Sequence, residues 1–102
     1  MIMVINYVSP PEEKAGDFEK AFLSGDRMQG VPGLLSFEFW KENGKNRYLV
    51  VTRWENEQYF HQWRQSEAFR RAHRDTSSSE GGTSELGVYQ VLRCEPNPWT
   101  SA

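Results

Sequence analysis

An Asn-Gly pair between two apolar runs constrains the fold of this chain more than any other feature of its sequence. The runs cover residues 34–41 and 47–54, and Asn43 and Gly44 lie between them. Both residue types accept a positive φ, which makes this pair the strongest short-range signal for a β-hairpin when apolar runs flank it. The segment therefore predicts two neighbouring antiparallel strands.

Further helices and strands are predicted on both sides of this hairpin. Residues 2–8 are rich in β-branched side chains, which favours a strand, and Pro10 ends it. Apolar side chains at helical spacing predict a helix over 12–28, with Phe18 and Phe22 on one face. The other predicted elements are a turn over 30–33, a helix over 57–65 that Asn56 caps and that continues after Ser66 to about His73, a flexible Ser-rich loop over 75–84 and a strand over 86–94.

The order of these elements is typical of one fold class. Strand-helix-strand-strand-helix-strand is the ferredoxin-like arrangement, an α+β fold in which helices cover a four-stranded antiparallel sheet. With 102 residues the chain has the length of a single domain. We expect this domain to span residues 1–95, followed by a C-terminal tail over 96–102.

The strand pattern also predicts how the chain assembles. Two helices can cover only one face of such a sheet, yet apolar side chains alternate onto both faces of the predicted strands. In the run 34–41, Phe37 and Phe39 point to one face and Trp40 to the other. Because an apolar open face favours a partner, we expect a homodimer in which two sheets pack face to face around a two-fold axis. The alternative is a monomer with scattered exposed apolar residues.

Charge and composition narrow the range of partners and locations. Twelve Lys and Arg against fourteen Asp and Glu leave a net charge of −2, which disfavours nucleic acid as a partner. The apolar start at 1–7 is far shorter than the ~20 residues of a membrane span, and it lacks the basic lead of a secretory signal. The single cysteine, Cys94, cannot form an internal disulfide. We therefore expect a cytoplasmic protein without a membrane segment.

Three side chains are candidates for function, and each has a structural alternative. Asn6 interrupts an apolar strand, so its amide either bonds a neighbouring backbone group or faces a ligand. Trp63 continues the buried face of the second helix, where tryptophan is ordinary core. His73, near the end of that helix, either complements the helix dipole or ligates a metal or heme iron. The sequence contains no P-loop, dinucleotide-binding fingerprint or zinc-ligand spacing.

These residues and their surroundings resemble a known family. Asn6, the segment 50–55 and the segments 60–63 and 68–73 together resemble the IsdG-like heme-degrading monooxygenases. That family belongs to the antibiotic-biosynthesis-monooxygenase superfamily of dimeric α+β barrels. The Trp-Glu pair at 54–55 is shared by the broad superfamily. The combination of Asn on the first strand, Trp on the second helix and His ten residues later is much more specific.

The resemblance implies a role for each candidate residue. His73 would be the proximal ligand of heme iron, Trp63 would press on the porphyrin and help hold it out of plane, and Asn6 would donate a hydrogen bond on the oxygen side. It also implies heme contacts from Phe22 and Phe69. Heme would then be both substrate and cofactor. With O2 and an external electron donor, either a reductase or a small reductant, the ring would open and iron would be released.

Two other functions remain open for such a chain. An enzyme of the same fold could oxidise a phenolic or polyketide substrate without a cofactor, and it would not need His73 as an iron ligand. A noncatalytic heme-binding dimer would hold heme without breaking it. Absorption spectra with hemin, before and after a reductant is added in air, separate both functions from heme degradation.

Overall fold

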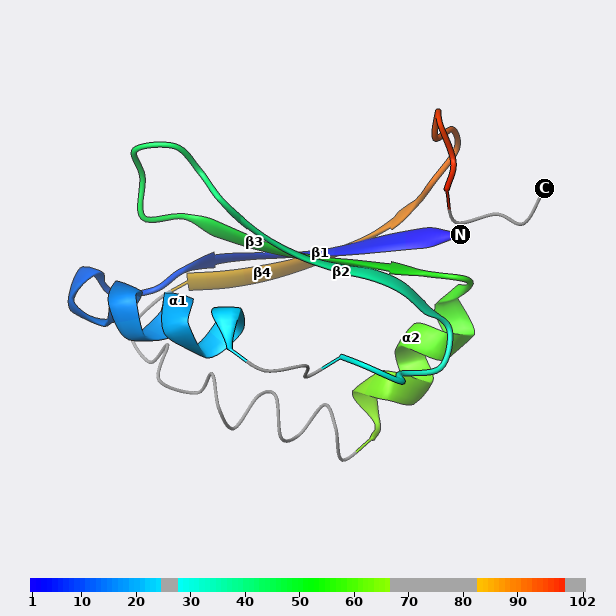
Figure 1. Ribbon diagram of the computed structural model, residues 1–102, viewed down its shortest axis with the longest axis horizontal. Helices are drawn as coiled ribbons and strands as arrows, with labels where there is room; N and C mark the ends of the chain where they lie inside the picture. The colour runs from blue at the N-terminus through cyan, green and yellow to red at the C-terminus, as the bar shows by residue number, and fades with distance from the viewer. Residues whose placement is uncertain (25–27, 67–82, 99–102) are drawn as a thin grey trace.

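One antiparallel sheet carries the helices on a single face (Figure 1). The computed structural model describes residues 1–24, 28–66 and 83–98. Its strands, in spatial order, are β2 (Leu34–Lys41), β3 (Tyr48–Trp54), β1 (Ile2–Ser9) and β4 (Thr83–Gln90), and its helices are the 3₁₀ turn η1 (Glu12–Lys14), α1 (Ala15–Leu23) and α2 (Glu57–Arg64). This arrangement confirms the predicted ferredoxin-like α+β fold. Within the described ranges, no helix has the length and apolar character needed to cross a membrane.

The hairpin predicted from Asn43 and Gly44 is present, although its turn differs from the expected one. β2 and β3 pair antiparallel along their length. Gly44 has a φ of +74°, whereas no described residue other than glycine has a positive φ. The Glu42 carbonyl accepts a hydrogen bond from the Lys45 N–H at 3.2 Å. A two-residue turn of type I′ needs a positive φ at both central residues, so the chain closes instead by a longer loop that requires this conformation of glycine alone.

Two predicted boundaries are wrong, and the backbone explains each difference. The helix expected over 12–28 begins as the turn η1 and ends at Leu23, because Ser24 is extended with φ −102° and ψ 138°. The last strand, expected over 86–94, covers Thr83–Gln90. Its limits follow the hydrogen-bonded ladder with β1 rather than the apolar run in the sequence.

Two further predictions lie partly outside the described residues. Of the loop expected over 75–84, residues 83 and 84 belong to β4, and the rest lies outside the described ranges. Asn56 caps α2 as expected, its side-chain oxygen accepting from the Tyr59 N–H at 3.1 Å. The continuation of this helix to His73 lies outside the described residues beyond Ser66. The domain limit at residue 95 stays a prediction.

Strand register divides the side chains of the sheet between two faces. Val4 lies opposite Thr52, and Val8 lies opposite Tyr48. Residues directly opposite each other point to the same face, here the face that packs against the helices. We call it the helix-side face and the other the open face. Buried residues of the helix-side face form two clusters, the α2 cluster (Ile2, Val4, Trp54 and Phe60) and the α1 cluster (Val8, Phe18 and Tyr48).

The open face also carries apolar side chains, as the strand pattern predicts. Tyr7, Trp40 and Tyr89 are 40%, 45% and 43% exposed. Register places Tyr7 and Trp40 on either side of Leu49, on the face opposite the helices. A hydrogen bond with Tyr7, followed by partial burial, raises the pKa of Tyr89, so the Tyr89 hydroxyl keeps its proton at neutral pH. The homodimer that would cover this face stays a prediction.

Gly33 should be a sensitive position for the stability of the fold. It has a φ of +76°, and a Cβ at this position would overlap the ring of Tyr59 on α2. Gly44 has nearly the same φ, +74°, with no atom within 4 Å of a Cβ. We expect Gly33→Ala to lower the free energy of unfolding by more than about 2 kcal/mol, because it adds a steric clash to backbone strain. Gly44→Ala should lower it by only about 1 kcal/mol.

Urea denaturation of the two variants measures this difference. Equal losses of stability would show that α2 does not depend on close contact with the backbone at residue 33.

Candidate functional site

Asn6 is a polar residue in the middle of the helix-side face. In β1 it lies between Val4 of the α2 cluster and Val8 of the α1 cluster. Its neighbours across the two ladders are Val50 and Leu86. Since side chains alternate along a strand, Asn6 points to the same face as these residues. The sheet thus holds one amide among apolar side chains, between the two clusters.

Apolar side chains beside Asn6 are open to solvent. Leu86, opposite Asn6, is 44% exposed, and Val88, opposite Val4, is 42% exposed. Single exposed apolar residues are ordinary on a protein surface, but these two adjoin each other and the amide. They form an apolar floor with one hydrogen-bonding group, which suits a flat and largely apolar ligand.

Trp63 reaches the same face from α2. Its side chain is partly buried and packs against the α2 cluster, with its ring centroid 5.7 Å from that of Trp54 and the rings inclined by 41°. A pocket of about 330 Å³ adjoins it, lined by residues of α2 and of the turn before β2, among them Tyr59 and Pro32. Trp63 therefore packs on the core, as tryptophan at this position commonly does, and it also borders a pocket.

A buried hydrogen bond holds the ring on which Trp63 packs. Trp54 is fully buried, and its Nε1–H donates to the hydroxyl oxygen of Thr52 at 2.9 Å. The same ring lies 5.8 Å from that of Phe60 on α2, measured between centroids. Thr52 and Trp54 therefore position Trp63. The sequence pattern did not single out Thr52, although a hydroxyl on a buried strand position is the signal that could have done so.

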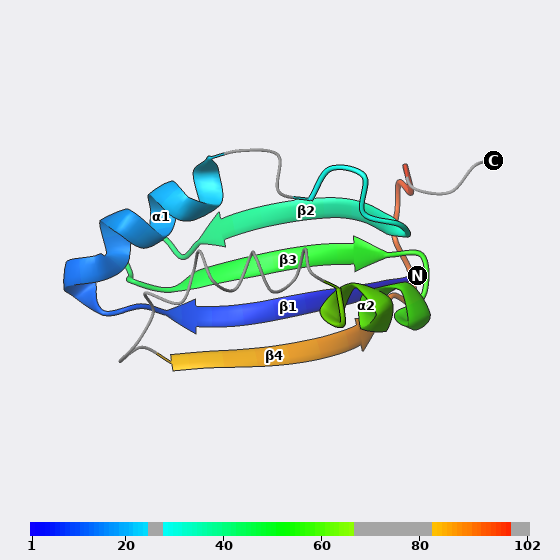
Figure 2. The same ribbon diagram turned by 90° about the horizontal axis from the view of Figure 1, so that it is seen from below.

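Phe22 forms the corresponding aromatic wall on α1. Its ring centroid lies 4.9 Å from those of both Phe18 and Phe39, and its ring is nearly parallel to that of Phe39, at 16°. Figure 2 shows α1 and α2 over opposite ends of the sheet. Because Phe22 packs on the α1 cluster and Trp63 on the α2 cluster, they stand on either side of Asn6 along the strands.

The titratable groups near these residues have structural roles. Burial, and then the charge of Glu19, raises the pKa of Tyr48 in the α1 cluster, so the Tyr48 hydroxyl keeps its proton at neutral pH. His61 lies on the exposed side of α2, with its Nε2 3.7 Å from the carboxylate of Glu57. The His61 side chain is 56% exposed, so this histidine is solvated.

The structure describes part of the predicted site. Asn6, Phe22 and Trp63 come from three different elements and belong to the same face, whereas Phe69 and His73 lie outside the described residues. The described part consists of an amide between two aromatic walls. It can orient a flat ligand through one hydrogen bond and exclude water from it.

The chain matches one protein family over most of its length. The model of the antibiotic biosynthesis monooxygenase family matches residues 1–75. The chain is 32% identical over 100 residues to a staphylobilin-producing heme oxygenase of Staphylococcus haemolyticus, covering 90% of this chain and 96% of the relative. It is 31% identical over 64 residues to a mycobilin-producing heme oxygenase of Mycobacterium tuberculosis, covering 61% of each chain.

Solved structures show the same fold. The structure is similar to MhuD, a heme degrader of Mycobacterium tuberculosis solved with two hemes bound in its active site, with a TM-score of 0.73, 27% identity, and 92% and 98% of the two chains covered. It is also similar to SnoaB, a cofactor-independent oxygenase of Streptomyces nogalater, with a TM-score of 0.75, 17% identity, and 94% and 97% covered. At that identity, the likeness to SnoaB shows the fold alone.

The link from Thr52 to Trp63 can be tested in the protein without a ligand. Two indole rings with centroids 5.7 Å apart are close enough to give an exciton-coupled signal in far-ultraviolet circular dichroism. We expect Thr52→Val to weaken this signal and to lower the free energy of unfolding by about 1–3 kcal/mol, because the Trp54 N–H loses its acceptor. Thr52→Ser retains the hydroxyl and should retain the signal. An undiminished signal in Thr52→Val would mean that packing alone positions the two rings.

Proposed function

This chain belongs to the antibiotic biosynthesis monooxygenase family, in its IsdG-like branch, and we propose that it binds heme on the helix-side face and degrades it. Heme is both substrate and cofactor in this proposal. O2 and electrons from an external reductant open the porphyrin ring and release its iron. The matches to this family and to its heme oxygenases confirm the resemblance found in the sequence, whereas the roles of individual residues belong to the proposal.

The observation that carries this proposal is the position of Asn6. Its amide lies on an apolar floor that is partly open to solvent, between a cluster on α1 and a cluster on α2. Heme is flat and apolar over most of its surface apart from its two propionates, and a hydrogen-bond donor near its iron influences how O2 is bound and activated. The relatives named as heme oxygenases, and the heme-bound MhuD structure, support heme as the ligand of this floor.

Each described residue of the site has a proposed task. Bound heme supplies the iron that takes up O2 and the ring that is oxidised. Asn6 donates a hydrogen bond from its amide toward the oxygen side, from a rigid position in the central part of the sheet. Trp63 packs its bulk against the ring plane, and Thr52 and Trp54 hold it there. Phe22 lies on α1, on the other side of Asn6 from Trp63, and excludes water from that end of the site.

His73 and Phe69 complete the proposed site. One neutral imidazole suffices as an axial ligand of heme iron, and His73 is the histidine at the matching position of the family pattern. His61 is solvated on the outside of α2 and is not a candidate. Phe69 lies four residues before His73 in the sequence and is proposed as a further apolar contact to heme.

Assembly and location are part of the same proposal. A homodimer that packs two open faces together covers Tyr7, Trp40 and Tyr89 and leaves one heme site on each helix-side face. An electron-donating reductase or a small reductant acts on each site from outside. A cytoplasmic location, expected from the single cysteine, stays a prediction.

Hemin titration followed by reduction tests the activity itself. We expect a saturable Soret band on adding hemin to the protein. Adding ascorbate in air should then bleach this band and release iron that a ferrous chelator captures. A Soret band that persists under ascorbate and air would indicate heme binding without degradation. The absence of any protein-bound Soret band would favour a cofactor-independent oxygenase.

Histidine variants test the iron ligand, and the chain offers a matched control. We expect His73→Ala to shift or broaden the Soret band, to weaken hemin binding at least tenfold (about 1.4 kcal/mol) and to abolish turnover. His61→Ala removes an exposed imidazole from α2 and should leave the Soret band, hemin binding and turnover unchanged. An unaltered spectrum and full turnover in His73→Ala would refute the assignment of the ligand.

Variants of Asn6 and Trp63 separate binding from chemistry. Asn6→Ala should bind hemin within about threefold of the unaltered chain but degrade it about a hundredfold more slowly, because it loses a positioned donor and keeps the iron ligand. Trp63→Phe should also keep most of the binding while slowing ring opening, because only the bulk against the ring changes. Spectra and single-turnover rates measure both. Turnover at the normal rate in Asn6→Ala would contradict its proposed role.

A further inference from the structure

The pocket of about 330 Å³ beside Trp63 has two walls that the fold holds in place. One wall is the turn before β2, which is tied to the end of β3 because the Gly33 carbonyl accepts a hydrogen bond from the Glu55 N–H at 2.9 Å. The other wall is α2, which packs on the sheet through the α2 cluster. Figure 2 shows this turn and α2 at the same end of the sheet. The pocket is therefore built before a ligand enters it.

No charged side chain lines this pocket within the part of the chain that the structure describes. Its lining combines carboxamides, a hydroxyl, aromatic rings and an apolar turn, contributed by Gln29, Gly30, Val31, Pro32, Tyr59, Gln62, Trp63 and Ser66. At Gly30 no atom lies within 4 Å of the position that a Cβ would take, so bare backbone borders the space. Each carboxamide offers a donor and an acceptor side by side. The lining suits an uncharged, flat ligand with hydrogen-bonding groups at its edge.

A smaller pocket continues along α2 from the first one. Its volume is about 170 Å³, and Tyr59 and Gln62 line both pockets. Asn56 and Gln58 complete its lining, which adds two further carboxamides and no charge. Carboxamides bind hydroxyl groups equally well as donors and as acceptors. The two pockets together suit a flat ring with an uncharged polar tail.

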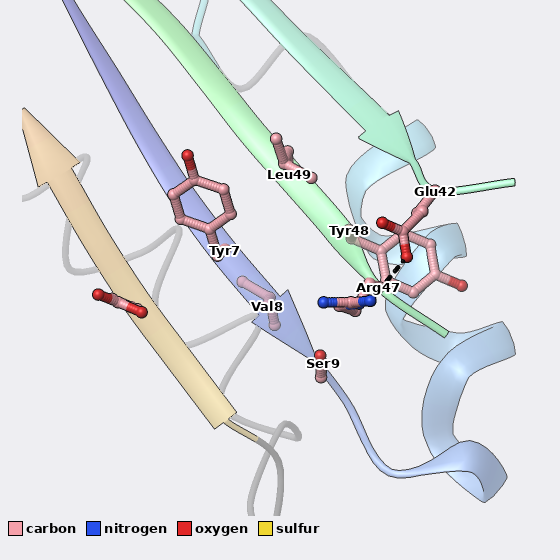
Figure 3. Close-up of a pocket in the computed structure, with 8 residues that line it drawn as sticks. Tyr7, Val8, Ser9, Glu42, Arg47, Tyr48 and Leu49 are labelled. Atoms are coloured by element: carbon pink, nitrogen blue, oxygen red, sulfur yellow. Dashed lines mark ion pairs between the residues drawn. The ribbon is translucent and has the colours of Figure 1, made fainter. Parts of the chain in front are cut away.

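A larger pocket on the open face has a different chemistry (Figure 3). Its volume is about 570 Å³, and Glu42 and Arg47 of the β2–β3 hairpin form an ion pair of 3.1 Å beside it. Tyr7 and Leu49, which also line it, lie opposite each other in the β1–β3 ladder. The proposed homodimer covers this face, whereas the pocket beside Trp63 lies on the helix side and stays accessible to a diffusing ligand.

We propose that the pocket beside Trp63 binds the ring of a free flavin, which acts as the electron donor to heme. The pyrimidine edge of a flavin presents an N–H between two carbonyl groups, and these groups match the donors and acceptors of Gln29 and Gln62. The rest of the ring is flat and packs against Trp63 and Pro32. The hydroxyl groups of the ribityl tail bond to carboxamides of the smaller pocket. A terminal phosphate contributes little, because the lining offers it no cation.

This inference rests on the proposed function and names the class of its external reductant. A reduced flavin releases two electrons and two protons as it becomes the oxidised flavin. Each electron reduces one ferric heme iron to the ferrous state, and the protons pass to the solvent. Because Trp63 borders the pocket and is proposed to pack on heme, the donor lies beside the acceptor. A flavin reductase that oxidises a pyridine nucleotide must then supply the reduced flavin.

Riboflavin titration of the heme-free protein tests this site without heme. We expect saturable quenching of riboflavin fluorescence, because the ring packs against tryptophan, with a dissociation constant in the micromolar range. Gln62→Leu should raise this constant at least tenfold. The matched control is Gln65→Leu at an exposed glutamine outside both linings, which should leave it within about twofold. Unsaturable quenching, or equal effects of the two variants, would overturn the proposal.

Two related ligands test the orientation of the flavin. FMN carries the same ring and an added phosphate, and it should bind within about threefold of riboflavin. Lumichrome has the ring without the ribityl tail. Gln58→Leu should weaken riboflavin several-fold and leave lumichrome within about twofold. FMN binding more than tenfold tighter than riboflavin, or equal effects of Gln58→Leu on riboflavin and lumichrome, would contradict the proposed placement.

Hemin distinguishes failure of this inference from failure of the proposed function. One equivalent of hemin should leave riboflavin binding within about threefold in equilibrium dialysis, and displacement of riboflavin would overturn the proposal. Under CO without air, reduced riboflavin should reduce bound hemin at a rate that saturates with riboflavin, and Gln62→Leu should slow this reduction but not reduction by dithionite. A rate that never saturates would also overturn the proposal. A chain that binds riboflavin but no hemin would refute the proposed function and leave the flavin pocket in place.

Discussion

Alternation of side chains along β1 is the constraint on which the rest of this structure depends. β1 lies between β3 and β4, and its ladders set which residues of both neighbours face the helices. Val4 and Val8 take up positions in the two buried clusters, and the strand period then leaves Asn6 between them on the same face. A shift of register by one residue would bury Tyr7 and turn Asn6 to the open face. The position of one amide thus follows from the packing of valines on either side of it.

Much of the fold follows from local patterns in the sequence, and the exceptions have nonlocal causes. Asn43-Gly44 predicts the hairpin because turn chemistry is local, although only Gly44 needs a positive φ. The limits of β4 depend on the length of β1, which lies far away in the sequence. Of the site, Asn6 and Trp63 could be found from their residue types. The hydroxyl of Thr52 on a buried strand position is a signal in the sequence, but its partner, the Trp54 N–H, is known only from the packed structure.

The two faces of the sheet carry different features. The helix-side face carries aromatic walls on α1 and α2, which leave an amide and exposed Leu86 and Val88 between them. The open face carries tyrosines, a tryptophan and a pocket flanked by charged groups, features that favour contact with another protein surface. Because the same strands form both faces, contacts in the proposed dimer would stiffen the floor on which heme is proposed to rest. This links assembly to the rigidity of the site without requiring a residue to serve both.

Locating iron in crystals of the hemin complex tests the central claim most directly. An anomalous difference map at the iron edge gives the metal position independently of how the ring is fitted. We predict one peak per chain on the helix-side face, between α1 and α2, with His73 as the protein ligand and the amide of Asn6 on the opposite side of the ring. A peak on the open face, or one on the helix-side face without His73 as its ligand, would contradict this account.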